Sequence, residues 1–135
     1  MNDRELVKMA SRARERAYAP YSKFKVGAAL LAKNGKVYTG CNIESASYTP
    51  TNCAERTAFF KAVSEGVTEF AAIAVVGAHE ASSIDLCYPC GVCRQVMAEF
   101  CSGDFRIIMG DDVGRLQICT LDELLPYRFG PENLE

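Results

Sequence analysis

The segment Phe70–Gly77, Phe-Ala-Ala-Ile-Ala-Val-Val-Gly, constrains the fold of this chain more than any other segment. It is apolar throughout and shows no alternation of apolar with polar side chains. A strand of this kind is buried on both of its faces, which occurs in sheets that carry helices on each side. The segment therefore predicts a sheet with a helical layer on either face.

Helical patterns occur before and after this strand, as such a sheet requires. Residues 3–18 place Leu6, Met9 and Ala10 on one stripe with charged residues between them, which predicts an amphipathic helix. Pro20 lies at the end of that helix or just beyond it. Further helices are expected at 53–65, at about 91–101 and, after a Thr120–Glu123 capping box, in a short stretch that ends at Pro126.

Two strands joined by a tight turn precede the second helix. They cover Phe24–Ala32 and Lys36–Ile43, and the Asn-Gly pair between them is a strong signal for an antiparallel hairpin. Two further strands are expected at Phe105–Met109 and Arg115–Cys119. The order α-β-β-α-β-α-β-β-α predicts the α/β class, as a three-layer α/β/α sandwich around a five-stranded mixed sheet. The tail, 127–135, has no partner in this arrangement.

Length and composition limit the class of protein. The 135 residues contain no repeat and no linker-like segment, so we expect a single domain over residues 1–135. The net charge of −2 disfavours a protein that coats nucleic acid, and no run reaches the ~20 apolar residues that span a bilayer. Residues 1–5 lack the layout of a signal peptide. A cytoplasmic protein without nucleic-acid or membrane partners is expected.

The chain has seven cysteines, at positions 41, 53, 87, 90, 93, 101 and 119. A reducing compartment disfavours disulfides and an odd number cannot pair completely, so a metal site or catalytic thiols are expected. The Cys90–Cys93 pair, together with Cys53 upstream, suits zinc. Three protein thiolates leave one tetrahedral position free, which a catalytic zinc needs and a structural zinc does not.

Both cysteine segments, Cys53-Ala-Glu and Pro-Cys90-Gly-Val-Cys93, stand at expected helix starts. The backbone N–H groups there carry partial positive charge, which lowers a thiol pKa and favours the thiolate that binds metal. Arg56 in the same turn would offset more of the thiolates' negative charge by donating to one of them. Glu55, beside the metal, would take a proton from the attacking water and deliver it to the substrate.

A Cys-x-Glu segment followed by Pro-Cys-x-x-Cys is the three-cysteine form of the zinc nucleobase deaminase signature. Over nearly its whole length the chain resembles the small, homotetrameric cytidine deaminases. Five ordered motifs carry this resemblance: Tyr18-Ala-Pro-Tyr-Ser-Lys-Phe24, Val26-Gly-Ala-Ala-Leu30, Gly40-Cys-Asn-Ile-Glu44, Cys53-Ala-Glu-Arg-Thr57 and Pro89-Cys-Gly-Val-Cys-Arg-Gln95.

The resemblance implies hydrolytic deamination of cytidine and 2′-deoxycytidine to uridine and 2′-deoxyuridine, with release of ammonia, in pyrimidine salvage. It implies one zinc ion per chain, bound by Cys53, Cys90 and Cys93. It also implies that Glu55 is the proton shuttle and that Arg56 donates to the zinc-binding thiolates.

The resemblance implies substrate contacts as well. Phe24 would pack against the pyrimidine, the backbone at Ala54 would read the base, and Asn42 with Glu44 would hold the ribose 3′-hydroxyl, from one face of a strand end. In a homotetramer, Tyr48 and the tail residue Phe129 would complete the sites of neighbouring subunits.

Several alternatives stay open. Cys87, three residues before Cys90, also has a metal-binding spacing, although the preceding proline and the resemblance favour the Cys90–Cys93 pair. The thiols could instead be packing residues, Glu55 a carboxylate placed by the helix dipole and Phe24 a core residue. Rival functions are a deaminase of another aminopyrimidine nucleoside such as an antibiotic, a tRNA- or DNA-acting deaminase, and a structural zinc module without activity.

Overall fold

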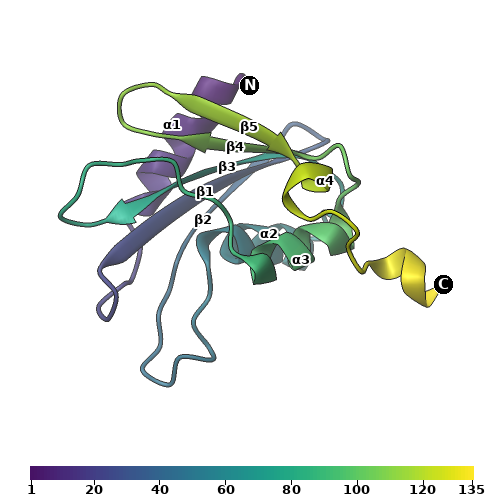
Figure 1. Cartoon of the computed structure of the whole chain (residues 1–135), viewed down its shortest axis with the longest axis horizontal. Coiled ribbons are helices and arrows are strands. Elements are labelled where there is room, and N and C mark those ends of the chain that lie inside the picture. Colours follow the sequence, from purple (N-terminus) through teal and green to yellow (C-terminus); the bar gives the residue numbers. More distant parts are fainter.

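The computed structural model describes residues 1–135 and is built around one mixed sheet of five strands, in the order β2-β1-β3-β4-β5 (Figure 1). The strands are β1 (Phe24–Ala32), β2 (Val37–Cys41), β3 (Phe70–His79), β4 (Arg106–Gly110) and β5 (Leu116–Thr120). The helices are α1 (Asp3–Arg14), α2 (Ala54–Ser64), α3 (Gly91–Phe100), α4 (Leu121–Leu124) and the short 3-10 helix η1 (Pro131–Leu134).

Only one strand pair is parallel. β3 and β4 run parallel, whereas the β1–β2, β1–β3 and β4–β5 pairs are antiparallel. The β1–β2 hairpin turns at Gly35, whose φ of +90° is a conformation that glycine adopts without a steric penalty. The expected mixed sheet and its Asn-Gly hairpin are confirmed.

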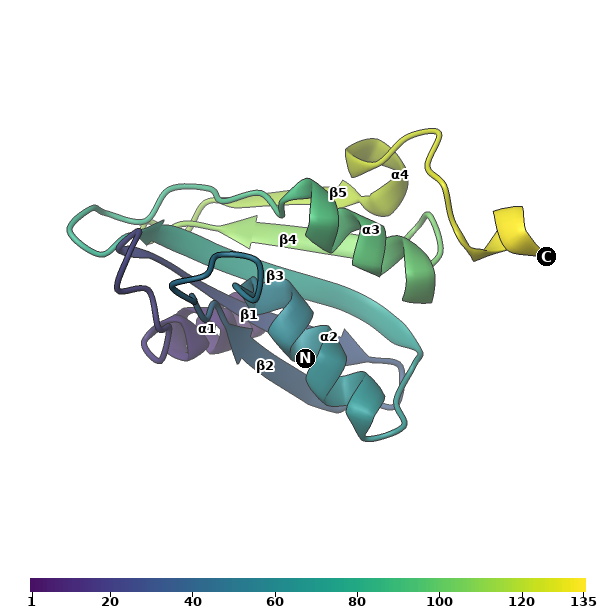
Figure 2. The ribbon, with the colours of Figure 1, turned by 90° about the horizontal axis from the view of Figure 1, so that it is seen from below.

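Helices cover both faces of the sheet, as the apolar strand β3 requires. α1 packs on one face through Leu6 and Ala10, which join a cluster with Ala29 of β1. α2, α3 and α4 pack on the opposite face, in a larger cluster that contains Ala28 and Leu30 of β1. Figure 2 shows α2 and α3 side by side in front of the sheet and α1 behind it. The three-layer α/β/α sandwich is confirmed.

The first helix ends earlier than its apolar stripe predicts. α1 ends at Arg14 and not at residue 18, because the backbone of Tyr18 forms a β-bridge with Ile43. The N–H of Tyr18 donates to the carbonyl of Asn42 at 2.9 Å, and its carbonyl accepts from the N–H of Glu44 at 2.9 Å. These tertiary hydrogen bonds replace the last helical turn. The remaining elements agree with the expected positions to within a few residues.

The C-terminal tail extends away from the sandwich (Figure 1). Its η1 helix contributes no buried residue, but the side chain of Gln95 on α3 donates to the carbonyl of Phe129 at 2.7 Å. The tail therefore has a partner that the sequence pattern did not indicate. None of the helices combines the length and the apolar character needed to traverse a lipid bilayer.

Candidate metal centre and substrate cavity

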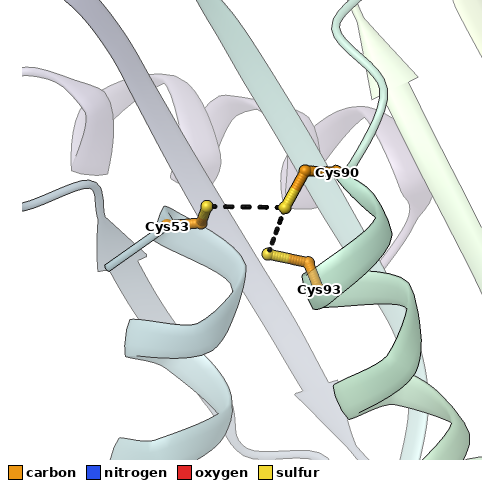
Figure 3. Close-up of side chains that lie close together, drawn as sticks. All are labelled: Cys53, Cys90 and Cys93. Atoms are coloured by element: carbon orange, nitrogen blue, oxygen red, sulfur yellow. Dashed lines mark hydrogen bonds between the residues drawn. The ribbon is translucent and has the colours of Figure 1, made fainter. Parts of the chain in front are cut away.

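Three cysteine thiols from two helices lie together on the α2–α3 face of the sheet (Figure 3). The Sγ atoms of Cys53 and Cys90 are 3.6 Å apart, those of Cys90 and Cys93 are 3.5 Å apart, and all three lie within 4.8 Å of one another. The predicted grouping of these three residues is thus present in the structure. Cys87 does not belong to the cluster.

The helix starts place these thiols. Cys53 is the N-cap of α2 and Cys90 is the N-cap of α3, both with extended backbone conformations. Neither cap side chain makes a capping hydrogen bond to the backbone of its helix, so both thiols are free to face the cluster. Because the two helix N-termini converge, their partial positive charges act on the same group of sulfur atoms.

The thiol cluster fits a zinc ion. Tetrahedral zinc with Zn–S bonds of about 2.3 Å holds two thiolates roughly 3.8 Å apart, close to the two sulfur–sulfur separations given above. The donor set is also the one that zinc prefers, and Cys93 is fully buried while Cys90 is exposed. A protein ligand for the fourth position is not part of the cluster.

Arg56 lies against the thiols. Its Nη2 donates to the Sγ of Cys53 at 3.4 Å, and its buried Nε has no hydrogen-bond partner. The pKa of Cys53 falls to about 5, because the Cys93 thiol donates to it and the Arg56 guanidinium stabilises its negative charge. The same coupling raises the pKa of Cys93. Arg56 and the neighbouring thiol thus favour the thiolate form of Cys53, which is the form that binds metal.

Glu55 is the one carboxylic acid among the buried residues of the site. Its exposed fraction is 3 %, although it is a carboxylate in the first turn of α2. Burial raises the pKa of Glu55 to about 7, and the neighbouring Cys53 charge adds to that effect. A carboxyl group is rarely buried unless it has a partner. The burial of Glu55 beside the thiols therefore distinguishes it from a carboxylate on the exposed surface of a helix.

A cavity of about 270 Å³ opens onto these groups. Its lining includes Cys53, Ala54, Glu55 and Cys90, together with Phe24, which is 41 % exposed. The wall also contains residues that the motifs did not single out as site residues, which are Ser22, Val26, Thr51, Asn52, Cys87 and Tyr88. Thr51, Asn52 and Tyr88 come from loops whose positions depend on the fold, so no local pattern singles them out.

Asn42 and Glu44 also line the cavity, and each already binds the backbone. Nδ2 of Asn42 donates to the carbonyl of Phe24, and its Oδ1 accepts from the N–H of Val26, both at 2.8 Å. Glu44 accepts from the hydroxyl of Ser22 and from the backbone N–H groups of residues 21 and 22, and the Ser22 hydrogen bond lowers the pKa of Glu44. Each side chain retains further hydrogen-bonding capacity that faces the cavity.

Tyr48 and Phe129 do not reach this cavity. Tyr48 is 75 % exposed in the loop between β2 and α2, and Phe129 is 59 % exposed in the tail. Figure 1 shows both segments extending away from the sandwich. The structure therefore brings together the three cysteines, Glu55, Arg56, Phe24, Ala54, Asn42 and Glu44. Tyr48 lines an adjoining hollow that shares Ser22, Glu44 and Thr51 with this cavity, and Phe129 lines neither.

The sandwich, the thiol cluster and the buried carboxylate are the features of an α/β enzyme with a candidate three-thiol metal site. The family described as "Cytidine and deoxycytidylate deaminase zinc-binding region" matches residues 1–109. The chain belongs to this family of deaminases.

Relatives match over the full length of the chain. A protein named cytidine deaminase from Sporosarcina psychrophila is 52% identical over 134 residues, which cover 99% of this chain and 96% of the relative. The crystal structure of cytidine deaminase from Burkholderia pseudomallei superposes with a TM-score of 0.87 and 48% identity, over 96% of this chain and 100% of that one. A blasticidin-S deaminase from Bacillus cereus is 31% identical over 131 residues, covering 94% of this chain and 91% of its own.

Proposed function

We propose that this protein is a zinc-dependent deaminase that converts cytidine and 2′-deoxycytidine to uridine and 2′-deoxyuridine in pyrimidine salvage. The observation that carries this proposal is the buried carboxylate of Glu55, which lines the same cavity as Cys53 and Cys90. The 52% identity to a cytidine deaminase over 99% of the chain supports cytidine as the substrate. A structural zinc module has no use for a buried carboxylate beside its thiols.

Cys53, Cys90 and Cys93 are the zinc ligands in this proposal, with one ion per chain. Zinc supplies Lewis acidity, which makes a water molecule reactive near neutral pH. Arg56 keeps the thiolate cluster from accumulating too much negative charge, since it donates to Cys53 from a position in the same helical turn. The two helix N-termini act in the same direction.

Glu55 moves protons during the reaction. Hydrolysis adds the oxygen of water to C4 of the pyrimidine and breaks the C4–N4 bond. Glu55 carries one proton from water to N3 of the ring and the other to the amine, which leaves as ammonia. One carboxyl group performs both transfers because it lies in the first turn of α2, in the wall of the cavity that holds the ring.

The remaining lining residues hold the nucleoside. Phe24 offers its exposed ring to the pyrimidine, and the backbone at Ala54 reads the polar edge of the base. Asn42 and Glu44 bind the ribose 3′-hydroxyl with the hydrogen-bonding capacity that the backbone does not use. The cavity of about 270 Å³ is small for a ligand site, which agrees with a nucleoside rather than a polymer.

The proposal includes a cytoplasmic homotetramer of single-domain chains, residues 1–135. Tyr48 and Phe129 are large aromatic residues that stay exposed in the isolated chain, at 75 % and 59 %. Exposed aromatic side chains on extended segments are suited to an interface. Each would complete the substrate site of a neighbouring subunit.

A second candidate function is deamination of an aminopyrimidine nucleoside antibiotic. The 31% identity to a blasticidin-S deaminase, over 94% of the chain, favours it enough for a direct test. Cytidine, 2′-deoxycytidine and blasticidin S are therefore compared as substrates. Turnover of blasticidin S alone would replace the first candidate with the second.

The decisive experiment follows the ultraviolet absorbance of cytidine with the purified protein, while zinc is counted per chain. The wild type is expected to bind about one zinc and to produce uridine and ammonia. Glu55→Gln is expected to keep the metal and lose nearly all turnover. Glu99→Gln, on an exposed position of α3, removes the same charge and is expected to stay active. Turnover by Glu55→Gln, or loss of its metal, would contradict the assigned role.

A further inference from the structure

A second cavity lies at the free edge of the sheet, away from the thiol cluster. It measures about 400 Å³ and is lined by α1, β2 and α2. Three of its lining residues are cations, namely Arg12 and Arg16 at the α1 end and Lys61 on α2, and none is acidic. In a chain with a net charge of −2, three positive charges around one concavity are a local exception.

These cations are not neutralised by the chain. All six ion pairs of the protein lie elsewhere. Arg12 and Arg16 are both exposed, whereas Arg14 between them is tied to the sheet through the carbonyls of Lys25 and Ala78. Guanidinium groups that have no partner within the chain are available to a bound anion.

The edge of β2 adds backbone donors to the cavity. The N–H of Asn42 donates inward to Val26 across the β1–β2 pair, at 3.2 Å. Alternate residues of an edge strand face outward, so the peptide groups of Thr39 and Cys41 point away from the sheet. Their carbonyls confirm this direction, because Lys61 Nζ donates to Thr39 and Thr57 Oγ1 donates to Cys41.

The wall of this cavity therefore offers mainly hydrogen-bond donors. α2 already covers the two outward carbonyls, whereas the N–H groups of Thr39 and Cys41 remain turned outward beside the cations. Burial raises the pKa of the Cys41 thiol while Lys61 and Arg16 act to lower it, so their positive potential reaches the strand edge. A site with several donors and cations and no carboxylate selects an anion with several charged oxygens.

We propose that this cavity, defined by Arg12, Arg16, Lys61 and the outer edge of β2, binds a phosphate-bearing small molecule. Arg12 and Arg16 grip the phosphate oxygens as planar donor pairs, and Lys61 adds a point charge from the opposite helix. The N–H groups of Thr39 and Cys41 orient the anion along the strand edge. The site is separate from the deaminase cavity, whose lining shares none of these residues.

Calorimetric titration with pyrophosphate at low salt tests the proposal on the zinc-loaded oligomer. The wild type is expected to bind, with an affinity that falls as sodium chloride is raised. Arg12→Gln and Arg16→Gln should each weaken binding about tenfold, and the double variant should abolish it, with deaminase turnover unchanged. Lys33→Gln, an exposed charge change outside the cavity, should bind like the wild type.

Backbone amide NMR locates the bound anion. The amide signals of Thr39 and Cys41 are expected to shift first as pyrophosphate is added. Comparing inorganic phosphate with ATP at equal ionic strength distinguishes the source, since tighter binding of ATP identifies an organic phosphate and equal or weaker binding identifies the free ion. Absence of binding, or equal binding by the double variant, would overturn the proposal. The proposal would also be overturned if the wild type bound no pyrophosphate and the double variant dissociated the oligomer. The cavity would then be an interface between subunits.

Discussion

The side-chain amide of Asn42 fixes the backbone of Phe24, the residue that presents its ring to the substrate cavity. Nδ2 donates to the Phe24 carbonyl at 2.8 Å, and Oδ1 accepts from the Val26 N–H at 2.8 Å. Asn42 thus positions the start of β1 as well as facing the cavity. A residue with both roles links substrate affinity to the stability of the start of β1.

Replacing Asn42 should therefore affect binding and stability together. Asn42→Asp places a carboxylate oxygen against the Phe24 carbonyl, and we expect a loss of about 1–3 kcal/mol in folding free energy. KM for cytidine should rise about tenfold, because the Phe24 ring is no longer held. Thermal unfolding and steady-state kinetics measure the two effects. Asn34→Ala, in the exposed hairpin turn, serves as the control. An increase in KM without any fall in Tm would show that Asn42 acts only on the ribose.

Arg56 should tune the metal centre without holding the metal itself. Its Nη2 contacts the Sγ of Cys53 at 3.4 Å, so Arg56→Gln removes a positive charge from the thiolate cluster. Loss of such an outer contact typically costs about 10- to 100-fold in activity or metal affinity. We expect kcat to fall within that range, with partial recovery in Arg56→Lys. Zinc competition with a chromogenic chelator separates the two effects. Unchanged kcat and unchanged zinc affinity would refute a charge-balancing role.

The local sequence predicts the bounds of some helices and strands but not of others. The bounds of β1 agree with the expected Phe24–Ala32, because an apolar run ends there at an Asn-Gly turn. The α1 helix ends earlier than its apolar stripe predicts, because the N–H of Tyr18 donates to the distant carbonyl of Asn42. Periodicity contains no information about a partner so distant in the chain.

The candidate site likewise contains residues that the local sequence predicts and residues that it does not. Cys53 and Cys90 were placed correctly because both stand at helix starts, which can be recognised from adjacent residues. The backbone contacts of Asn42 and Glu44 depend on strand register and loop path, so they emerge only from the folded chain. The cavity residues Thr51 and Tyr88 carry no motif and were not predicted.

Subunit complementation tests the roles proposed for Phe129 and Tyr48. Phe129→Ala should raise KM about tenfold, because its ring completes a neighbour's site in the proposed tetramer. Glu55→Gln chains are inactive in their own sites but still supply Phe129 to others. Mixed oligomers of the two variants should therefore contain sites with near wild-type KM. Tyr48→Ala is tested in the same pairing. Mixtures that show only the KM of the Phe129→Ala protein would contradict sharing between subunits.

Cys101 should resist alkylation until strongly alkaline pH. Burial raises the pKa of its thiol to about 12, so the reactive thiolate is roughly 1,000-fold scarcer at neutral pH than for an ordinary cysteine. Iodoacetamide labelling followed by peptide mass spectrometry should show slow modification at pH 8 that accelerates up to about pH 12. The same peptide should react rapidly in urea. Fast labelling of Cys101 in the folded protein would contradict the raised pKa of this partly buried thiol.

The same raised pKa predicts how Cys101 affects stability. The folded state holds this proton more tightly than the unfolded state does. The thiol's contribution to the free energy of unfolding is therefore fully present below the unfolded pKa of about 9. It is lost as pH rises from there toward about 12. Denaturant titrations should therefore give a smaller difference in the free energy of unfolding between the wild type and Cys101→Ala at high pH than at pH 7. A gap between the two proteins that widens with pH would refute this sign.

Gly27 should be the position of β1 least tolerant of a methyl group, because α1 packs directly against it. A Cβ there would lie 2.0 Å from the carbonyl oxygen of Ala10 and 2.4 Å from the amide nitrogen of Arg14. Both contacts are backbone atoms of α1 and its end, so relief requires the helix to move away from the sheet. Gly27→Ala is expected to cost about 3 kcal/mol or more, at the upper limit of overpacking effects.

A matched substitution separates this clash from the general cost of replacing glycine. Gly66 has a φ of +86° but open space around its Cβ position, so Gly66→Ala is expected to cost only about 1 kcal/mol, from backbone strain alone. Urea unfolding of the two variants, followed by circular dichroism, gives the comparison. Zinc content should remain at the wild-type level in both folded proteins, since neither glycine is close in sequence to the thiol cluster. Equal losses of stability in the two variants would show that α1 adjusts to the added methyl group without strain.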